Sequence, residues 1–406
     1  MADVGVVMPV YIQNPEFLWQ ALESVLHQTF TDFRLVIVID GAPEMEPFLK
    51  PIIGEDPRVT LISYVPNRGI AHALNTGFDL LFNEPDIHYL TWVSSDNIYE
   101  PRFLEILRRS LMKGPEELGI VYSSFQNIDN EGRPLNNEHQ LASQRIYQSA
   151  PIERLLDYSL IGVCFMYKAQ IAKLVGGYRM EPVEDYEYWL RLTEHCEIRY
   201  IPVELGKYRV NSTFSVSAQL QSTENHRRWR YAYHLSRYQA RVRREIAPMI
   251  TVLFPVVNAG AEEIARIENL YEQTYSNYIC RVLNLSPIEQ STAVLATIPH
   301  PTTDFCWMPV AEETQAICSV IEQQTPPYTL VLGPECFIGV QDIKFMLEAL
   351  ITSDDDIISS YYTDDHSKIE FRYRDAPSAK SHYYNELFRS ADLYDLLQLH
   401  CAQNNQ

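Results

Sequence analysis

Apolar positions follow two different periods along the first hundred residues. Four short runs without polar gaps predict buried strands, and the segments between them carry the three-to-four-residue apolar spacing of helices. The runs are Val4–Val10, Arg34–Ile39, Val59–Ser63 and His88–Val93. Strands without polar gaps are typical of parallel sheets that are covered on both faces. This β-α alternation predicts an α/β domain with an open, largely parallel sheet.

Polar side chains come directly after the fourth run. Asp96 and Asn97 follow it, before Pro101 opens a helical pattern. Open α/β sheets bind ligands at the carboxyl ends of their strands. Oxygen ligands of this kind hold Mg or Mn against a phosphate. The alternative is that Asp96 only caps the following helix, since Asp is favoured at such ends.

A second polar signal follows the second run. Asp40 and Gly41 end that run, and Arg68 lies in the loop after the third run. An Asp can accept hydrogen bonds from a base, and an Arg can pair with a base or a phosphate. These residues therefore suggest part of a nucleotide pocket. Asp-Gly is also a common turn sequence, and the two interpretations are compatible.

The segment Val183–Leu192 predicts a helix that begins with two carboxylates. Glu184 and Asp185 lie at or near its start. A carboxylate that faces a cleft from this position can act as a general base. Favourable charge at a helix amino terminus is the structural alternative. The residues expected to face the core are Tyr188, Trp189 and Leu192.

Length and composition indicate how many domains the chain forms, which ligands suit it and in which compartment it is expected. A chain of 406 residues is expected to form two domains. Its formal net charge of −20 argues against nucleic-acid binding, and an anionic ligand then needs local cations or a metal. The seven scattered cysteines, with no CxxC pair, predict reduced thiols. We see neither a signal peptide nor a membrane-spanning run, so we expect a cytoplasmic protein.

Together these motifs resemble the family 2 inverting glycosyltransferases, which have the GT-A fold. The resemblance covers roughly Val4 to Ser217. Its motifs are, in order, VVMPVY, LESVLHQTF, VIVIDG, NRGIAHALNTG, WVSSDN, GGYRMEPVEDYEYWLRL and YRVNS. Their common order and spacing carry the resemblance, and no single motif is diagnostic.

The resemblance implies a nucleotide-sugar pocket and a catalytic base. Asp185, in its pair with Glu184, matches the base. A single displacement at the anomeric carbon would then invert its configuration. The residues assigned to the nucleotide sugar are Pro9, Tyr11, Asp40, Arg68, Ser95, Asp96 and Arg209.

The resemblance also implies a divalent cation, Mn or Mg, on the diphosphate. Asp96 matches the final acidic position of the family's D-x-D metal motif, with Asn97 and Asn211 as weaker ligands. Ser94 replaces the first Asp of that motif, and Asn211 stands where many relatives have a His. Weak metal affinity is therefore expected, and loss of divalent dependence stays open.

The expected donor is a UDP-sugar, and the expected acceptor is a glycan or lipid-linked hydroxyl in polysaccharide synthesis for the cell envelope. The sugar could be a hexose or an N-acetylhexosamine. The alternative function is a non-catalytic GT-A-like protein that binds nucleotide sugars or serves as a scaffold. We also leave open a homo-oligomer and peripheral contact with the inner face of a membrane.

The second half of the chain repeats the first. Ile250–Val256 matches Val4–Val10, and the following helical segment places Gln273 over Gln28. The second copy lacks the Asp-Gly pair and the Glu-Asp helix. We therefore expect a shortened, degenerate GT-A-like domain without a catalytic site.

A basic and aromatic segment, His226–Glu245, joins the two halves. It could contact anionic lipid, which would suit a lipid-linked acceptor. The favoured alternative is a connector whose arginines pair with the acidic domains and whose Trp229, Tyr233 and Tyr238 pack against them. The expected domains are a catalytic domain over 1–220, a helical linker over 221–247, the degenerate domain over 248–397 and a tail over 398–406.

Overall fold

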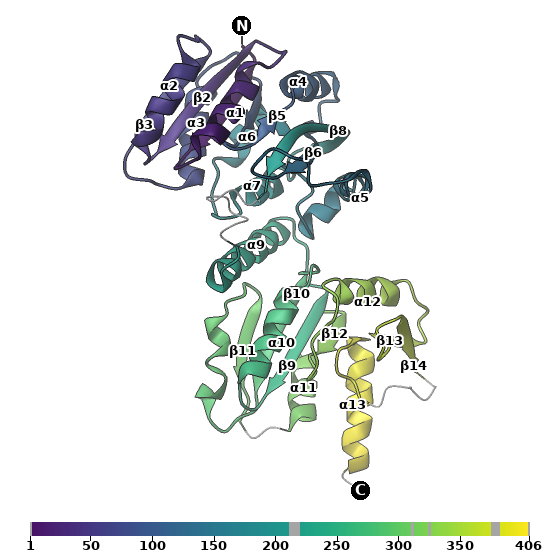
Figure 1. Ribbon diagram of the computed structural model, residues 1–406. Helices are drawn as coiled ribbons and strands as arrows, with labels where there is room; N and C mark the ends of the chain where they lie inside the picture. The colour runs from purple at the N-terminus through teal and green to yellow at the C-terminus, as the bar shows by residue number, and fades with distance from the viewer. Residues whose placement is uncertain (1, 211–219, 310–311, 324–325, 375–381, 405–406) are drawn as a thin grey trace. The chain divides into compact units, whose positions relative to one another are not determined.

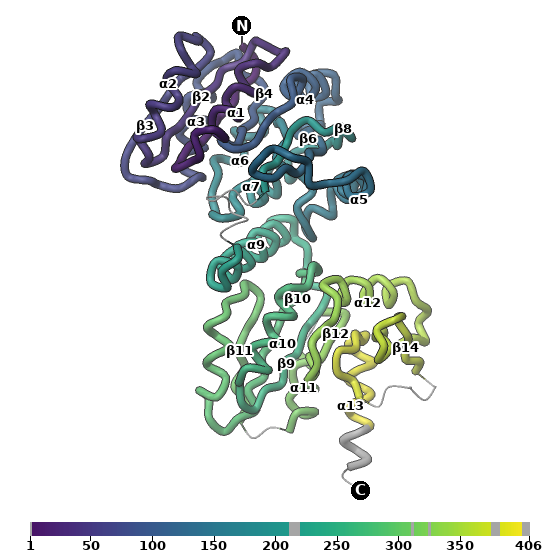
Figure 2. Tube along the Cα trace, in the orientation of Figure 1, coloured from purple at the N-terminus to yellow at the C-terminus, as the bar shows by residue number. Residues whose placement is uncertain are grey.

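The computed structural model describes the chain except for residues 1, 211–219, 310–311, 324–325, 375–381 and 405–406. The chain divides into two compact units, Met1–Ser236 and Arg237–Gln406 (Figure 1). Each unit has its own sheet and its own hydrophobic core, and the trace of each can be followed in Figure 2.

Unit 1 is built on an eight-stranded mixed sheet with the order β3-β2-β1-β4-β7-β6-β8-β5. The first four strands form a parallel set, as predicted: β1 pairs with β2 and β4, and β2 pairs with β3. The second half of the sheet departs from the parallel prediction, because β7 is antiparallel to β4 and β6, and β5 is antiparallel to β8. The strands are β1 Val4–Val10, β2 Phe33–Asp40, β3 Val59–Tyr64, β4 Tyr89–Trp92, β5 Ile98–Tyr99, β6 Leu118–Ile128, β7 Phe165–Lys168 and β8 Glu197–Arg209.

The helices of unit 1 fall largely where the apolar period predicts them. Asn14 caps α1 by accepting the N–H of Glu16 at 2.9 Å, and Pro15 occupies the first helical position. Helix α4 begins at Phe103 rather than Pro101, because Ile98 and Tyr99 first pair with β8. The N-cap of α4 is Arg102, so the interpretation of Asp96 as a cap is wrong. The α-helices are α1 Pro15–Leu26, α2 Glu46–Ile53, α3 Ile70–Phe82, α4 Phe103–Lys113, α5 Glu138–Gln148, α6 Ala169–Val175 and α7 Glu184–Leu192.

Unit 2 reproduces this topology in a seven-stranded sheet with the order β11-β10-β9-β12-β15-β13-β14. Ile250 pairs with Tyr278, just as Val4 pairs with Phe33, which confirms the predicted repeat at the level of register. The two sheets differ at one edge. In unit 2, β14 pairs with β13 as an antiparallel hairpin, whereas in unit 1 β8 is parallel to β6. The strands are β9 Ile250–Val256, β10 Tyr278–Asn284, β11 Thr303–Trp307, β12 Tyr328–Val331, β13 Ile357–Tyr362, β14 Ile369–Tyr373 and β15 Glu386–Arg389. The helices are α10 Ala261–Tyr271, α11 Glu313–Ile321, α12 Asp342–Ile351 and α13 Ser390–Asn404, and α13 includes most of the residues expected to form a tail.

One glutamine holds the same place in both units. The side-chain amide of Gln28 donates to the carbonyl of Glu100 at 2.8 Å and accepts the N–H of Leu104 at 2.9 Å. Gln273 donates to the carbonyl of Gly339 at 2.8 Å and accepts the N–H of Ile343 at 3.3 Å. Each glutamine thereby satisfies backbone groups at the start of the helix after the central strand. The alignment of Gln273 with Gln28 therefore corresponds to equivalent contacts.

The basic segment forms helix α9, Thr223–Arg243. Its residues up to Ser236 belong to unit 1, where Trp229 stacks on Tyr233 and Tyr233 stacks on Tyr186. This stacking agrees with the packed interpretation for these two rings, whereas Tyr238 is exposed. Lipid contact stays a prediction. Across the described residues, no helix has both the length and the apolar character needed to cross a bilayer.

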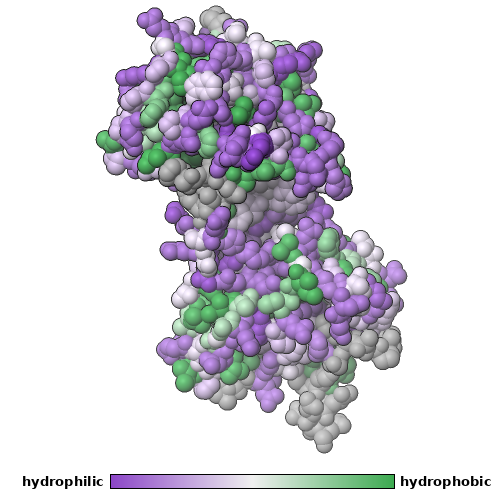
Figure 3. All heavy atoms as spheres, viewed as in Figure 1, coloured by the Kyte–Doolittle hydropathy of each residue, from purple (hydrophilic) through white to green (hydrophobic). Residues whose placement is uncertain are grey.

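The face of unit 1 seen in Figure 3 is mostly hydrophilic, with apolar residues scattered singly or in small groups. Apolar surface of this kind is ordinary for a folded domain. Among the described residues, this face of unit 1 therefore offers no large apolar patch.

Candidate active site

A cavity of about 800 Å³ opens in unit 1 where several strands end. Its wall includes residues at the carboxyl ends of β1, β2, β4 and β8. Helix α7 and the first turns of α9 add further wall residues. This is the position at which open α/β sheets bind ligands.

Most of the predicted site residues meet in this cavity. Arg68 is not among the lining residues, and Asn211 lies outside the described part of the chain. The lining residues that the sequence singled out are Pro9, Tyr11, Asp40, Ser95, Asp96, Asn97, Glu184, Asp185 and Arg209.

Asp40 organises the loop that precedes α3. Its buried carboxylate accepts the N–H of Arg68 at 2.8 Å, the N–H of Gly69 at 2.9 Å and the side-chain amide of Asn67 at 3.0 Å. The next residue, Gly41, turns the chain with φ of 75°. Asp40 is thus part of a turn and part of the cavity wall at once.

The side chain of Arg68 lies away from the lining residues. It is exposed, with its guanidinium carbon 5.5 Å from the centre of the Tyr64 ring and one nitrogen 3.4 Å from Nε2 of His72. A role in nucleotide binding would require this side chain to turn toward the cavity. The role of Arg68 therefore remains a prediction.

Ser94 orients the carboxylate of Asp96. The Ser94 hydroxyl donates to Oδ1 of Asp96 at 2.6 Å, and the Ser94 N–H donates to the Tyr99 hydroxyl at 3.0 Å. Asp96 itself is 8% exposed. The serine that replaces the first Asp of the family's metal motif therefore supports the carboxylate that remains.

Asn97 is held with its oxygen turned toward the backbone. Its Oδ1 accepts the N–H of Arg209 at 3.0 Å, and its buried Nδ2 has no hydrogen-bond partner among the described residues. An amide nitrogen donates hydrogen bonds and offers no oxygen lone pair to a cation. The structure therefore does not support the predicted metal-ligand role of Asn97. The Nδ2 group suits an anionic or carbonyl oxygen instead.

Arg209 is committed to the protein rather than to a ligand. It is 1% exposed, and burial lowers its pKa while the nearby Asp96 carboxylate opposes that shift. The guanidinium lies 4.0 Å from the centre of the Phe17 ring. Its donors reach the carbonyls of Asp96, Asp129 and Asn130 and Oε1 of Gln20, at 2.8 to 3.1 Å. This geometry favours a role in holding the Asp96 loop over the predicted contact with the nucleotide sugar.

Helix α7 brings two carboxylates to the cavity. The indole N–H of Trp92 donates to Oδ1 of Asp185 at 3.1 Å, which ties the helix to the end of β4. Burial raises the pKa of Asp185 well above its usual range, and the charge of Glu184 adds to that shift. A carboxylate with a raised pKa holds a proton more readily, as a general base must.

Glu184 is the more deeply buried of the two. It is 6% exposed, and its Oε2 has no hydrogen-bond partner within the described ranges. Burial raises the pKa of Glu184 to about 7, with a smaller contribution from the charge of Glu181. The first turn of α7 thus places two poorly solvated carboxyl groups at the cavity wall, and their burial favours the protonated forms.

This environment predicts a pH-dependent stability. The pKa of Glu184 is raised by folding, so its protonated form stabilises the native state below its unfolded pKa, and this stability is lost as pH rises through about 7. As the pH rises from about 5 to about 8, we expect the urea concentration at the unfolding midpoint to decrease more steeply for the wild type than for Glu184→Gln. Equal slopes for the two proteins would contradict this assignment.

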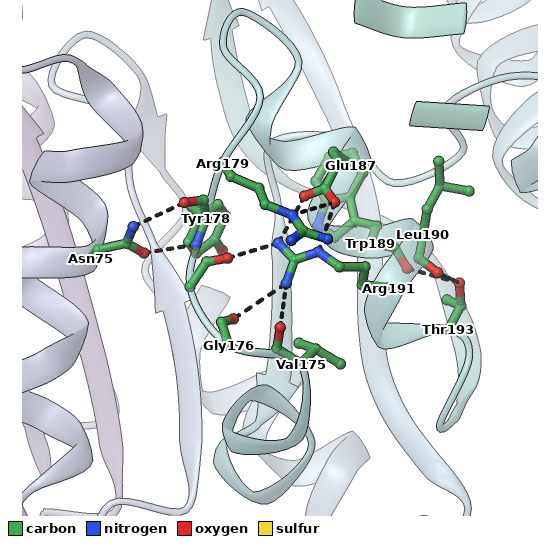
Figure 4. A network of polar contacts seen from close by, with 11 residues as sticks. Asn75, Val175, Gly176, Tyr178, Arg179, Glu187, Trp189, Leu190, Arg191 and Thr193 are labelled. Atoms are coloured by element: carbon green, nitrogen blue, oxygen red, sulfur yellow. Dashed lines mark hydrogen bonds and ion pairs between the residues drawn. The ribbon is translucent and has the colours of Figure 1, made fainter. Parts of the chain in front are cut away.

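A buried ion pair that the sequence analysis missed holds α7 in place (Figure 4). The guanidinium of Arg191 donates to both oxygens of Glu187 at 2.7 Å, and the two side chains are 5% and 1% exposed. Arg191 also donates to the carbonyls of Val175 and Gly177 at 2.6 and 2.7 Å. The spacing of the pair, four residues along one helix, is a signal that could have revealed it.

The fold and the cavity together define an α/β domain with a ligand site at the carboxyl ends of its strands. Residues 5–175 match the model of "Glycosyl transferase family 2". The N-terminal unit therefore carries a glycosyltransferase family 2 domain, with the GT-A fold.

Known proteins are similar to this chain at low identity. An uncharacterized glycosyltransferase of Rickettsia typhi is 22% identical over 55% of this chain and 69% of its own length. The chondroitin synthase of Escherichia coli is 28% identical over 49% of this chain, and the match spans only 27% of that enzyme. The structure of S. aureus TarS 1–349 in complex with UDP-GlcNAc matches at 13% identity, with a TM-score of 0.46, over 58% of this chain and 66% of that one.

Proposed function

We propose that the protein is an inverting glycosyltransferase that uses a nucleoside-diphosphate sugar, by expectation a UDP-sugar. The acceptor is a hydroxyl of a glycan or of a lipid-linked glycan. The observation that carries this proposal is the position of Asp185, which shares one cavity with the Asp96 loop and is joined to β4 through Trp92. A base and a diphosphate site within one cavity are what a single displacement requires.

In this reaction Asp185 accepts the proton of the acceptor hydroxyl while that oxygen attacks the anomeric carbon. The hydrogen bond from Trp92 leaves Oδ1 engaged and orients the carboxylate. The bond between the anomeric carbon and the diphosphate breaks on the opposite face, and the configuration inverts. Asp40 and the loop that it holds form the donor side of the cavity.

A divalent cation fits this site only in part. No cluster of three or more His, Cys, Asp or Glu suited to a metal occurs in the ranges that the structure covers. Asp96 would be the protein ligand, with diphosphate oxygens and water completing the shell, an arrangement common for Mg. When bound, the cation would neutralise charge on the departing diphosphate. We therefore propose that Mn or Mg binds together with the nucleotide rather than before it.

Calorimetric titration with UDP and GDP, with and without Mn, tests the metal proposal. We expect Mn to tighten nucleotide binding about tenfold or more in the wild type and to have little effect in Asp96→Ala, since Asp96 supplies the protein's charge at the cation. Asp86→Ala removes an exposed carboxylate outside the cavity and should behave as the wild type. An unchanged response to Mn in Asp96→Ala would contradict the assignment.

The competing proposal is a nucleotide-sugar-binding protein without transfer, which the sparse metal ligands favour. The two proposals differ in turnover. Release of nucleotide from a bound sugar donor, dependent on Asp185, supports the transferase. Tight binding with no release across a panel of sugar donors and glycan acceptors supports the binding protein.

A further inference from the structure

The amino terminus of α3 receives carboxylates from two distant parts of unit 1. Gly69 occupies the N-cap with φ of 94° and provides no side chain. Asp40 accepts the N–H of Gly69, and Oε1 of Glu181 accepts the N–H of Ala71 at 2.9 Å. The first N–H groups of a helix have no partner within the helix, and negative charge is favourable there. Glu181 therefore acts as a cap that comes from 110 residues away.

The fit between this carboxylate and the cap is close. A Cβ added to Gly69 would lie 2.4 Å from Oε1 and 2.7 Å from Oε2 of Glu181. Glycine also tolerates the positive φ at this position. Glu181 thus lies directly against the backbone of the loop that Asp40 organises.

A second contact fixes the same segment one helical turn further along α3. Asn75 accepts the N–H of Tyr178 at 2.7 Å and donates to the carbonyl of Tyr178 at 2.9 Å. Figure 4 shows this pair beside the contacts of Arg191 with the carbonyls of Val175 and Gly176. The segment that leads into α7 is therefore bound to α3 on one side and to α7 on the other.

We propose that Glu181 is a positioning residue that fixes the catalytic helix α7 to the donor-side loop, residues 67–71. The proposal rests on the proposed function, because it assigns the base to α7. Glu181 lies three residues before Glu184 and lines the same cavity as Asp185. Asp40 holds the loop independently, so loss of Glu181 releases the start of α7 while the donor side keeps its shape.

Three variants separate the reach of Glu181 from its charge. Glu181→Gln keeps an oxygen for the N–H of Ala71, Glu181→Asp keeps the charge but is one methylene shorter, and Glu181→Ala loses both. We expect kcat to fall about ten- to a hundredfold in the Ala and Asp variants, because small displacements of a base are costly. The Gln variant should stay within about threefold of the wild type, and UDP affinity should change by less than about twofold in all three.

Hydrogen exchange of peptides that cover 184–192 provides a readout that needs no turnover. We expect faster exchange in Glu181→Ala and Glu181→Asp than in the wild type and Glu181→Gln, and no change in Glu46→Ala, which alters the first turn of α2. Unchanged exchange in the Ala and Asp variants would overturn the inference, as would equal losses of UDP affinity and kcat. If the wild type turns over no nucleotide sugar, the proposed function fails while the exchange data still decide the role of Glu181.

Discussion

Asp185→Asn is expected to lower sugar transfer about a thousandfold while nucleotide binding stays nearly unchanged. The amide keeps the size of the carboxylate and an oxygen for the indole N–H of Trp92, but it cannot accept the acceptor's proton. Because the base acts on the acceptor, the donor side of the cavity should be unaffected. Release of UDP from a UDP-sugar in the presence of acceptor measures transfer, and calorimetry with UDP measures binding.

The matched control for this variant is Glu184→Gln, which changes the neighbouring carboxylate in the same turn. We expect its transfer rate to stay well above that of Asp185→Asn, because Trp92 orients Asp185 and not Glu184 in the described structure. Full turnover by Asp185→Asn would remove Asp185 from the role of base. A Glu184→Gln variant as inactive as Asp185→Asn would assign the base to the pair rather than to one residue.

Arg191→Met is expected to have the largest effect on stability, a loss of about 3 kcal/mol or more in the free energy of unfolding of unit 1. Methionine nearly fills the space of the arginine side chain, so the effect would come from the lost charge and hydrogen bonds rather than from a cavity. Glu187, 1% exposed, would keep Arg179 as its one ion-pair partner among the described residues, and two backbone carbonyls would lose their donor. Urea unfolding followed by tryptophan fluorescence measures the change.

Glu84→Ala is the control for this variant, since it breaks an exposed ion pair with Arg34 in the same unit. Pairs of that kind contribute less than about 1 kcal/mol. Similar midpoints for Arg191→Met and the wild type would show that the buried pair does not determine the stability of α7.

Much of the fold could be predicted because the first four strands and the helices between them have strong apolar periods. The register match of Val4 and Ile250 likewise followed from aligned sequence runs. The antiparallel half of the sheet could not be predicted. Strand β5 is only two residues long and shows no period, and the apolar residues of β7 do not indicate in which direction that strand runs.

The candidate site was predictable by position but not by orientation. Asp40, Asp96 and Asp185, which the sequence motifs assigned to the site, all line one cavity. The orientation of a side chain depends on contacts between residues far apart in the chain. Such contacts decide which atom of Asn97 faces the backbone, and they decide whether the guanidinium of Arg209 reaches a ligand or the protein. Glu181 illustrates the same limit, because nothing near it in sequence indicates that it caps α3.

The equivalent glutamines, Gln28 and Gln273, separate what the two copies share from what only one of them has. Both copies have the side chain that accepts a backbone N–H at the start of the helix after the central strand. The second copy has Asn284 where the first has the Asp40-Gly41 turn, and it has no Glu-Asp helix. A feature that both copies share, such as this glutamine, serves the fold. The features confined to the first copy are the ones that the proposed reaction uses.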